Sequence, residues 1–134
     1  MTTAHRPRVR RADTRIRRPM EIFQFDRGEK SVGRFGSRGF LATRIAAGDG
    51  KIHLTCLTLE PDGLIGTHPA TNSQLFLVIS GEGWVAGPDG RHINIRTGWA
   101  VRWNAGEEHT TGTDTGLVAL AVEGAPLDLF EPET

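Results

Sequence analysis

The sequence predicts an all-β domain whose short strands form a sandwich or a closed barrel. Seventeen glycines and seven prolines in 134 residues indicate many short elements joined by turns, because glycine supplies the positive φ of tight turns. The runs between these turns are short and rich in β-branched and aliphatic residues, and no window of eleven or more residues keeps a helical period. With 37% apolar residues, one domain of this length can bury a core.

The individual strands follow from alternation and from turn signals. Eight to ten strands are expected, and they fall in the segments 21–25, 40–46, 51–59, 74–79, 84–86, 91–95, 99–103, 109–113 and 117–122. Four glycine-rich segments are expected to turn or stop the chain, at 48–50, 61–63, 80–83 and 87–90. Strands in this number and spacing are typical of a closed or double-sheet fold, which leaves few exposed strand edges.

Charge divides the chain into two parts. Residues 1–19 contain seven arginines and one acidic residue, Asp13, whereas residues 20–134 contain nine Lys and Arg against fifteen Asp and Glu. We therefore expect a basic, flexible arm over 1–19 and one barrel domain over 20–134. Met20 opens the patterned part and is a second candidate for the start of the chain. A basic arm can hold phosphates, but no helix-turn-helix pattern accompanies it, so we expect no nucleic-acid partner.

Cysteine count and hydropathy exclude two further classes. Cys56 is the only cysteine, so an intramolecular disulfide is impossible, which is typical of a reducing, cytoplasmic compartment. It lies among apolar residues and is expected to be a buried, inert thiol. No apolar stretch reaches the length of a membrane span, and no signal-peptide apolar region follows the basic start. We expect no membrane partner.

Two segments, 63–81 and 98–113, combine histidines with regularly placed glycines. Their marked positions are, in chain order, Gly63, His68, Ala70, Gln74, Gly81, Gly98, Asn104, Gly106, His109 and Thr113. In order and spacing they resemble the two motifs of the cupin superfamily, and the resemblance covers roughly residues 40–122. The first family motif is glycine, His-x-His, glutamate and glycine. The second is glycine, Pro-x-Gly and histidine, followed by asparagine.

This resemblance implies a double-stranded β-helix, the jelly-roll barrel, whose strands carry site residues into the interior. Cupin metal sites generally use three histidines and one glutamate. Position by position, His68 takes the place of the first histidine and His109 that of the last, while Ala70 replaces the second histidine and Gln74 the glutamate. The resemblance also implies a homodimer.

The two replacements weaken the case for a metal. Ala70 supplies no ligand, and Gln74 offers a neutral carbonyl oxygen where a carboxylate would stand. Two imidazoles and one amide bring no negative charge, and burying a dication without an anion carries a large desolvation penalty. We therefore expect weak or absent metal binding and assign no cofactor firmly. Binding of a divalent Fe, Mn, Ni or Zn ion by His68, Gln74 and His109 remains an open alternative.

The favoured hypothesis is a protein that binds a small molecule inside its barrel. Trp84, Trp99 and Trp103 are expected in the core or at the rim, where one or two of them floor a pocket. His53 and His92 lie outside both motifs and are interpreted as structural. The expected pocket is built from His68, Gln74, Trp103 and His109.

The alternative is a metal-dependent enzyme of the dioxygenase or isomerase type, acting on a small polar substrate. Glu107 and Glu108 stand next to the last motif histidine and are the candidate catalytic residues for proton transfer. The sequence leaves open whether the chain is an enzyme and what its ligand is, because this fold hosts many chemistries.

Overall fold

The computed structural model describes residues 20–132, so the arm predicted over 1–19 lies outside the described residues. Strands account for nearly all of the regular structure in this range, and the one helical element there is the 3-10 turn η1 (Arg34–Gly36). The all-β prediction is confirmed. No helix of the described residues is long and apolar enough to cross a membrane.

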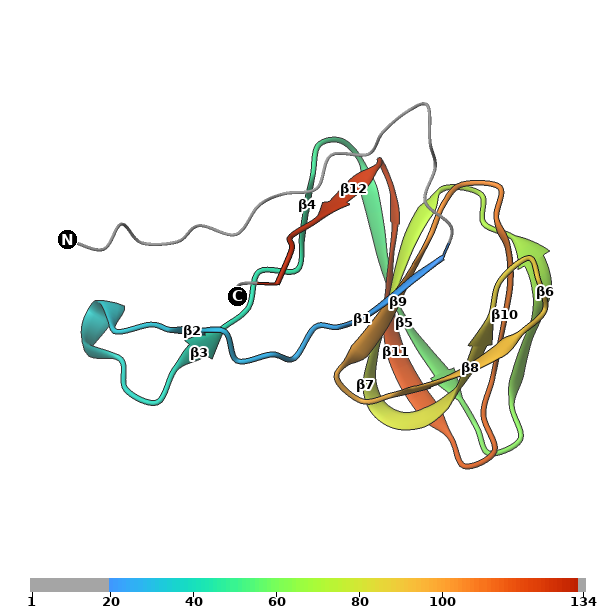
Figure 1. Ribbon diagram of the computed structural model, residues 1–134, viewed down its shortest axis with the longest axis horizontal. Helices are drawn as coiled ribbons and strands as arrows, with labels where there is room; N and C mark the ends of the chain where they lie inside the picture. The colour runs from blue at the N-terminus through green and yellow to red at the C-terminus, as the bar shows by residue number, and fades with distance from the viewer. Residues whose placement is uncertain (1–19, 133–134) are drawn as a thin grey trace.

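Two antiparallel sheets face each other and share one long strand (Figure 1). The first sheet has the order β1 (Glu21–Gln24), β9 (Trp99–Trp103), β7 (Ser73–Ala86), β11 (Leu117–Gly124) and β5 (Ile52–Leu59). The second has the order β8 (His92–Arg96), β7, β10 (Glu108–Gly112) and β6 (Leu64–Pro69). This is the jelly-roll arrangement, and the space between the sheets is called the lumen below.

The shared strand β7 corrects one predicted turn. Residues 80–83 were expected to reverse the chain, but β7 runs through them without a break. Its first half pairs with β9 and β11, and its second half pairs with β8 and β10. Gly81, at a φ of 86°, makes the bend, and a Cβ there would collide with the carbonyl oxygen of Gly116. The glycines therefore bend a strand between two sheets and do not end it.

A second correction concerns residues 40–51. The strand expected over 40–46 is two short strands, β3 (Leu41–Ala42) and β4 (Ala46–Gly48). The hairpin signal at 48–50 is also wrong, since β4 pairs with β12 (Leu127–Leu129) and β5 pairs with β11. The strands β4 and β5 therefore both pair with one continuous part of the chain, residues 117–129. Between β4 and β5, Gly50 lets the backbone pass close to Ala125. The turns expected at 61–63 and 87–90 are confirmed by the hydrogen bonds that close them.

Two apolar clusters hold the sheets together. The lumen cluster includes Phe76, Val78, Val85 and Val101, each at most 1% exposed. The outer cluster covers the other face of the first sheet, where β4 and β12 lay Leu127 and Leu129 over its buried leucines. Each fully buried side chain of this size contributes about 1.5–3 kcal/mol. Cys56 points to this outer face beyond the cover and is exposed, so the expectation of a buried thiol is wrong.

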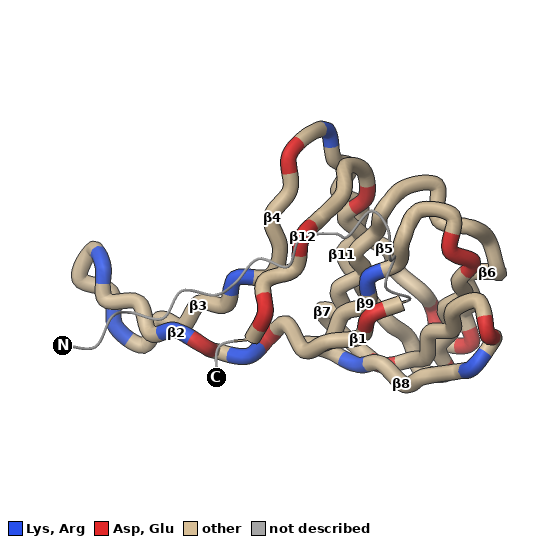
Figure 2. The backbone as a smooth tube through the Cα atoms, turned by 45° about the horizontal axis from the view of Figure 1, so that its top comes forward, with Lys and Arg blue, Asp and Glu red and all other residues tan. Residues whose placement is uncertain are grey.

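The strands β2 (Lys30–Ser31) and β3 form a hairpin that projects from the barrel, with η1 at its tip (Figure 1). Phe35 in η1 is 97% exposed, and Leu41 is 59% exposed. Residues 27–44 contain five Lys and Arg against one acidic residue, whereas residues 45–132 contain four against eleven. Figure 2 shows this separation of blue and red along the backbone. The hairpin is thus basic and apolar, and the barrel is acidic.

Candidate functional site

His68 enters the site through an irregular strand. In the pairing of β6 with β10, His68 lies opposite His109 and Ile65 lies opposite Thr111, so β6 has one residue more than β10 between these pairs. Such a bulge resets the alternation of side chains. Ile65 and His68 therefore share the face of His109 and Thr111, which is the buried lumen face. The segment 63–69 was not among the expected strands, because its glycine and proline mask the strand pattern.

The two motif histidines meet as predicted. Their ring centroids lie 4.4 Å apart, with His109 at 3% exposure and His68 at the exposed rim. Nδ1 of His68 donates to the carbonyl oxygen of Gly66 at 2.7 Å, and Nδ1 of His109 donates to that of Glu107 at 3.1 Å. Since a carbonyl oxygen only accepts, each neutral ring carries its proton on Nδ1. Both Nε2 atoms are left with a lone pair for another group.

Trp103 forms the floor below His109. The two rings stack with centroids 4.2 Å apart, and Trp103 is 0% exposed. Phe76 packs against its other side at a centroid distance of 5.9 Å. The indole Nε1 is buried and has no hydrogen-bond partner among the described residues. Leaving such a donor unpaired costs about 1–3 kcal/mol, which an acceptor brought by a ligand or a water would remove.

Gln74 stands beside this floor, and Ala70 is buried in the same lumen cluster as Trp103. Gln74 is the direct partner of Trp103 across β7 and β9, and it is half-buried. Ala70 is 4% exposed and belongs to the lumen cluster. Its backbone bonds to the turn before β10, with Ala70 N donating to Glu107 O at 3.0 Å. The four predicted pocket residues thus lie at one end of the lumen.

Two further residues, His53 and Glu123, belong to this end and were missed as site residues. The register places His53 opposite Glu123 and Glu123 opposite Gln74, so the row continues across β5, β11, β7 and β9. Directly opposed antiparallel residues share a face, with Cβ atoms about 4.5–5.5 Å apart. Because Trp103 is on the lumen face, so are the others. The signal for Glu123 was the period-two pattern of β11, whose residues 117, 119 and 121 are all buried.

Burial lowers the pKa of His109 below its ordinary value of 6.5. The hydrogen bond to the backbone of Glu107 opposes this shift, the nearby His68 ring adds to it, and the carboxylates of Glu107 and Glu123 oppose it. The influence of Glu123 on this ring agrees with its place on the lumen face. His109 is therefore a neutral imidazole at pH 7 and accepts a hydrogen bond at Nε2.

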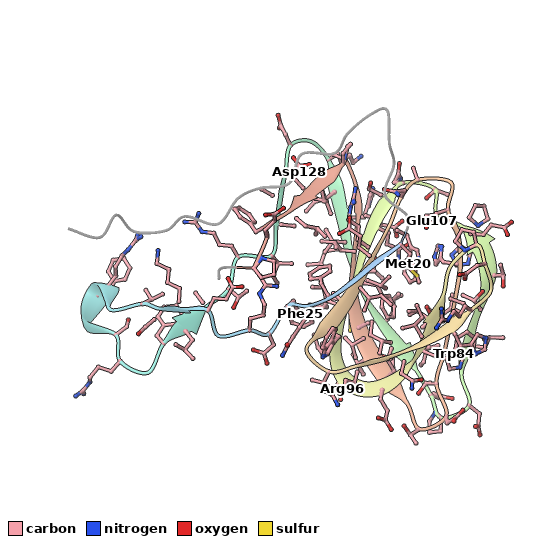
Figure 3. The ribbon with its side chains drawn as sticks, viewed as in Figure 1. Met20, Phe25, Trp84, Arg96, Glu107 and Asp128 are labelled. Atoms are coloured by element: carbon pink, nitrogen blue, oxygen red, sulfur yellow. The ribbon has the colours of Figure 1, made fainter. Side chains whose placement is uncertain are left out.

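The two candidate acids next to His109 have different surroundings. Glu107 is half-buried, and its carboxylate accepts from the backbone amides of Met20 at 2.8 Å and Asn104 at 2.9 Å. Figure 3 labels Met20 and Glu107 side by side at this end of the barrel. Glu108 is exposed and alternates away from His109. Glu107 thus anchors the first strand to the turn before β10, and catalytic roles for both acids stay predictions.

The donor set at this end does not fit the metal site that the fold family implies. Among residues 20–132, no three His, Cys, Asp or Glu side chains are placed to hold one metal ion. The two Nε2 atoms are oriented as metal-ligating histidines are, by Nδ1 bonds to backbone carbonyls. The second histidine and the glutamate of the family set are replaced by Ala70 and Gln74. We therefore derive no chemical step through a metal.

A cavity of about 600 Å³ lies apart from the motif histidines. Its lining includes Ile22 of β1, Ile95 of β8 and Trp99 of β9, together with the outward-facing side chains of Glu82, Trp84 and Arg96. Trp84 stacks on His92 at 3.7 Å on the outer side of β7 and β8, so His92 is outside the lumen, in keeping with the structural interpretation. None of the motif histidines lines this cavity.

Comparison with known proteins identifies the fold. Neither a family model nor a curated relative matches the sequence. Among solved structures, a protein with a double-stranded β-helix domain from Klebsiella pneumoniae aligns over 89% of this chain and 99% of its own, at 18% identity and a TM-score of 0.51.

Two structures named as cupins align over the barrel. A cupin superfamily protein from Desulfitobacterium hafniense covers 65% of this chain and 84% of its own, at 11% identity and a TM-score of 0.52. An RmlC-like cupin from Shewanella frigidimarina covers 61% and 67%, at 18% identity and a TM-score of 0.50. The chain therefore has the cupin fold, as the two motifs predicted. At these identities the likeness extends to the fold alone.

Proposed function

We propose that this protein binds a small polar molecule at the end of the lumen formed by His68, Gln74, Trp103 and His109. The main support is that polar atoms converge there without hydrogen-bond partners among residues 20–132. Both imidazole Nε2 atoms keep a lone pair, and the buried indole Nε1 of Trp103 keeps an unused proton. Groups left open in this way inside a packed barrel are suited to a ligand with matching donors and acceptors.

The same geometry supports binding without a resident metal. The site keeps one histidine from each motif but has a methyl group and an amide where the family set has its other two ligands. A polar organic molecule needs no dication to be held by an indole donor, an amide and two imidazole acceptors. Affinity should therefore survive removal of metal ions.

An NMR screen tests the proposal. The ¹⁵N-labelled full chain, purified without a tag, is screened against a library of small polar compounds in excess EDTA. We expect binders to shift the indole signal of Trp103 and the side-chain amide signals of Gln74. Binding should fall at least tenfold in His109→Ala, since losing one buried ligand hydrogen bond costs about 1.4 kcal/mol or more.

His92→Ala is the matched control for this screen, because His92 is an exposed histidine outside the lumen. It should bind as the parent protein does. Binders that appear only after a divalent metal is added, or that perturb Trp84 and leave Trp103 unchanged, would contradict the proposal.

We further propose that the protein forms a homodimer in which the projecting hairpin packs on a second copy. The hairpin carries exposed Phe35 and Leu41, and the outer face of β5 carries Ile52 at 51% exposure and Leu54 at 66%. The hairpin is basic and the barrel acidic, so hairpin and barrel of two copies attract each other. One chain thus carries two exposed apolar surfaces, one on a basic segment and one on an acidic segment. This combination favours self-association over an unrelated partner.

Light scattering after gel filtration tests the dimer. We expect twice the monomer mass for the parent protein and a shift toward monomer for Phe35→Ser with Leu54→Ser. Ile93→Ser, which removes an exposed isoleucine from β8, is the control and should stay dimeric. A monomeric parent protein would contradict this proposal.

A further inference from the structure

The polar row at the site end of the lumen has one charged member. On the strands of the two sheets within residues 20–132, alternation places the other Asp, Glu, Lys and Arg side chains on the outer faces, so Glu123 is the one such residue of these strands that faces the lumen. Glu123 is half-buried, and its neighbours in the row are His53 and Gln74. Neither neighbour is a fixed cation. The carboxylate of Glu123 therefore has no permanent positive charge beside it in this row, and a ligand of positive charge would supply one.

The hydrogen-bonding groups of the site favour the same class of ligand. His68 and His109 each present an acceptor at Nε2, because Nδ1 is already bonded to a backbone carbonyl. Glu123 adds two carboxylate oxygens, which only accept. The donors are the indole N–H of Trp103 and the amide of Gln74. Acceptors are therefore in excess, and a ligand rich in N–H or O–H donors satisfies them best.

Aromatic rings lie next to the same groups. The stacked pair of Trp103 and His109 lies beside Gln74, the neighbour of Glu123 in the row. Aromatic faces attract cations and do not attract anions, because the ring quadrupole is negative above the plane. Charge, hydrogen bonding and ring electrostatics thus select the same class of molecule.

We propose that the ligand of this site is a small amine or other organic cation whose charged nitrogen is held by Glu123, while its remaining polar groups bond to His68, His109 and Trp103. This inference rests on the proposed function and specifies the chemical class of its ligand. It assigns to Glu123 the role of a specificity-determining residue. Gln74, at the neighbouring position, then serves as a neutral hydrogen-bonding group.

Three probes of nearly equal size test the charge preference: ethanolamine, ethylene glycol and glycolate, which are cationic, neutral and anionic at pH 7. Each is titrated into the ¹⁵N-labelled full chain, and the indole signal of Trp103, identified through Trp103→Phe, is followed. We expect ethanolamine to bind at least tenfold more tightly than ethylene glycol and glycolate to bind most weakly. In Glu123→Gln the ratio of the affinity for ethanolamine to the affinity for ethylene glycol should fall to about one.

Glu82→Gln is the matched control, since Glu82 is an exposed glutamate on the distant half of β7. It should keep the parent preference. Equal affinities for all three probes, tightest binding of glycolate, or a preference that persists in Glu123→Gln would overturn the inference and leave the site itself in place. If none of the probes moves the Trp103 signal, this inference and the proposed function fall together.

Discussion

The apolar interior of the lumen and its polar end have opposite characters although the same strands build both. Along β7, Phe76 and Val78 are buried in a close-packed apolar cluster, while Gln74, two residues earlier on the same face, is half-buried among polar groups. Along β9, Val101 packs into that cluster, and Trp103 stacks on a histidine and keeps an unpaired N–H. A step of two residues along either strand therefore leads from a closely packed apolar side chain to a residue of the candidate site.

This difference separates the residues that stabilise the fold from those that form the candidate site. The apolar part of the lumen supplies the burial that stabilises the barrel. The polar end adds unpaired groups that cost stability, and in native proteins such costs concentrate at functional sites. The contrast gives four predictions, ordered by the size of the expected effect.

The largest effect is expected from neighbouring substitutions on β7. Phe76→Ala should lower the free energy of unfolding by about 3–5 kcal/mol, because it opens a cavity in the lumen cluster. Gln74→Ala, on the same face two residues away, should change it by less than about 0.5 kcal/mol. Urea denaturation of both variants measures the difference. Similar losses in the two variants would show that the apolar interior and the polar end of the lumen are not distinct.

Restoring the family's ligand set should convert the polar end into a metal site. Ala70→His combined with Gln74→Glu adds an imidazole and a carboxylate to His68 and His109. We expect the double variant to bind Ni²⁺ or Zn²⁺ at least a hundredfold more tightly than the parent protein, by calorimetry, with a packing cost of about 1–3 kcal/mol for the larger side chain at position 70. Gln74→Glu alone is the control, with a smaller gain. An unchanged metal affinity in a folded double variant would refute the assignment of these positions.

Adjacent acids should differ in their contribution to stability. Glu107→Ala should lower the free energy of unfolding by about 1.5–3 kcal/mol, because it removes an acceptor from the amides of Met20 and Asn104. Glu108→Ala should have an effect within about 0.5 kcal/mol, since this side chain is exposed. Thermal unfolding distinguishes the two. A full-sized loss in Glu108→Ala would be inconsistent with the assigned roles.

The smallest effect is the pH dependence contributed by His109. Burial lowers its pKa in the folded protein, so the unfolded chain binds the proton more readily. The free energy of unfolding should therefore be constant well above the ordinary pKa of 6.5 and fall as the pH decreases below it, until the folded protein also binds the proton. His109→Gln should flatten this slope below pH 6.5. The comparison requires urea titrations at several pH values, and equal slopes in both proteins would exclude a buried neutral His109.

Sequence patterns predicted the fold and brought the two motif histidines together, and the failures have physical causes. Alternation located the strands, and motif spacing brought His68 and His109 together although β6 itself was missed. The bulge that turns His68 inward depends on pairing with β10, which no local pattern records. Residues 80–83 look like a turn, but tertiary pairing on both sides keeps them within one bent strand. Glu123 escaped notice because its relation to Gln74 depends on the register between distant strands.

The protonation pattern of the two motif histidines tests the central claim most directly. Long-range ¹H–¹⁵N correlation spectra of the ¹⁵N-labelled protein at pH 8.5, assigned with His68→Ala and His109→Ala, report which ring nitrogen carries the proton. We expect both rings to be protonated at Nδ1 and bare at Nε2, with cross-relaxation between their ring protons. Protonation at Nε2 in both rings, or no magnetisation transfer between them, would mean that no pair of open acceptors converges inside this barrel.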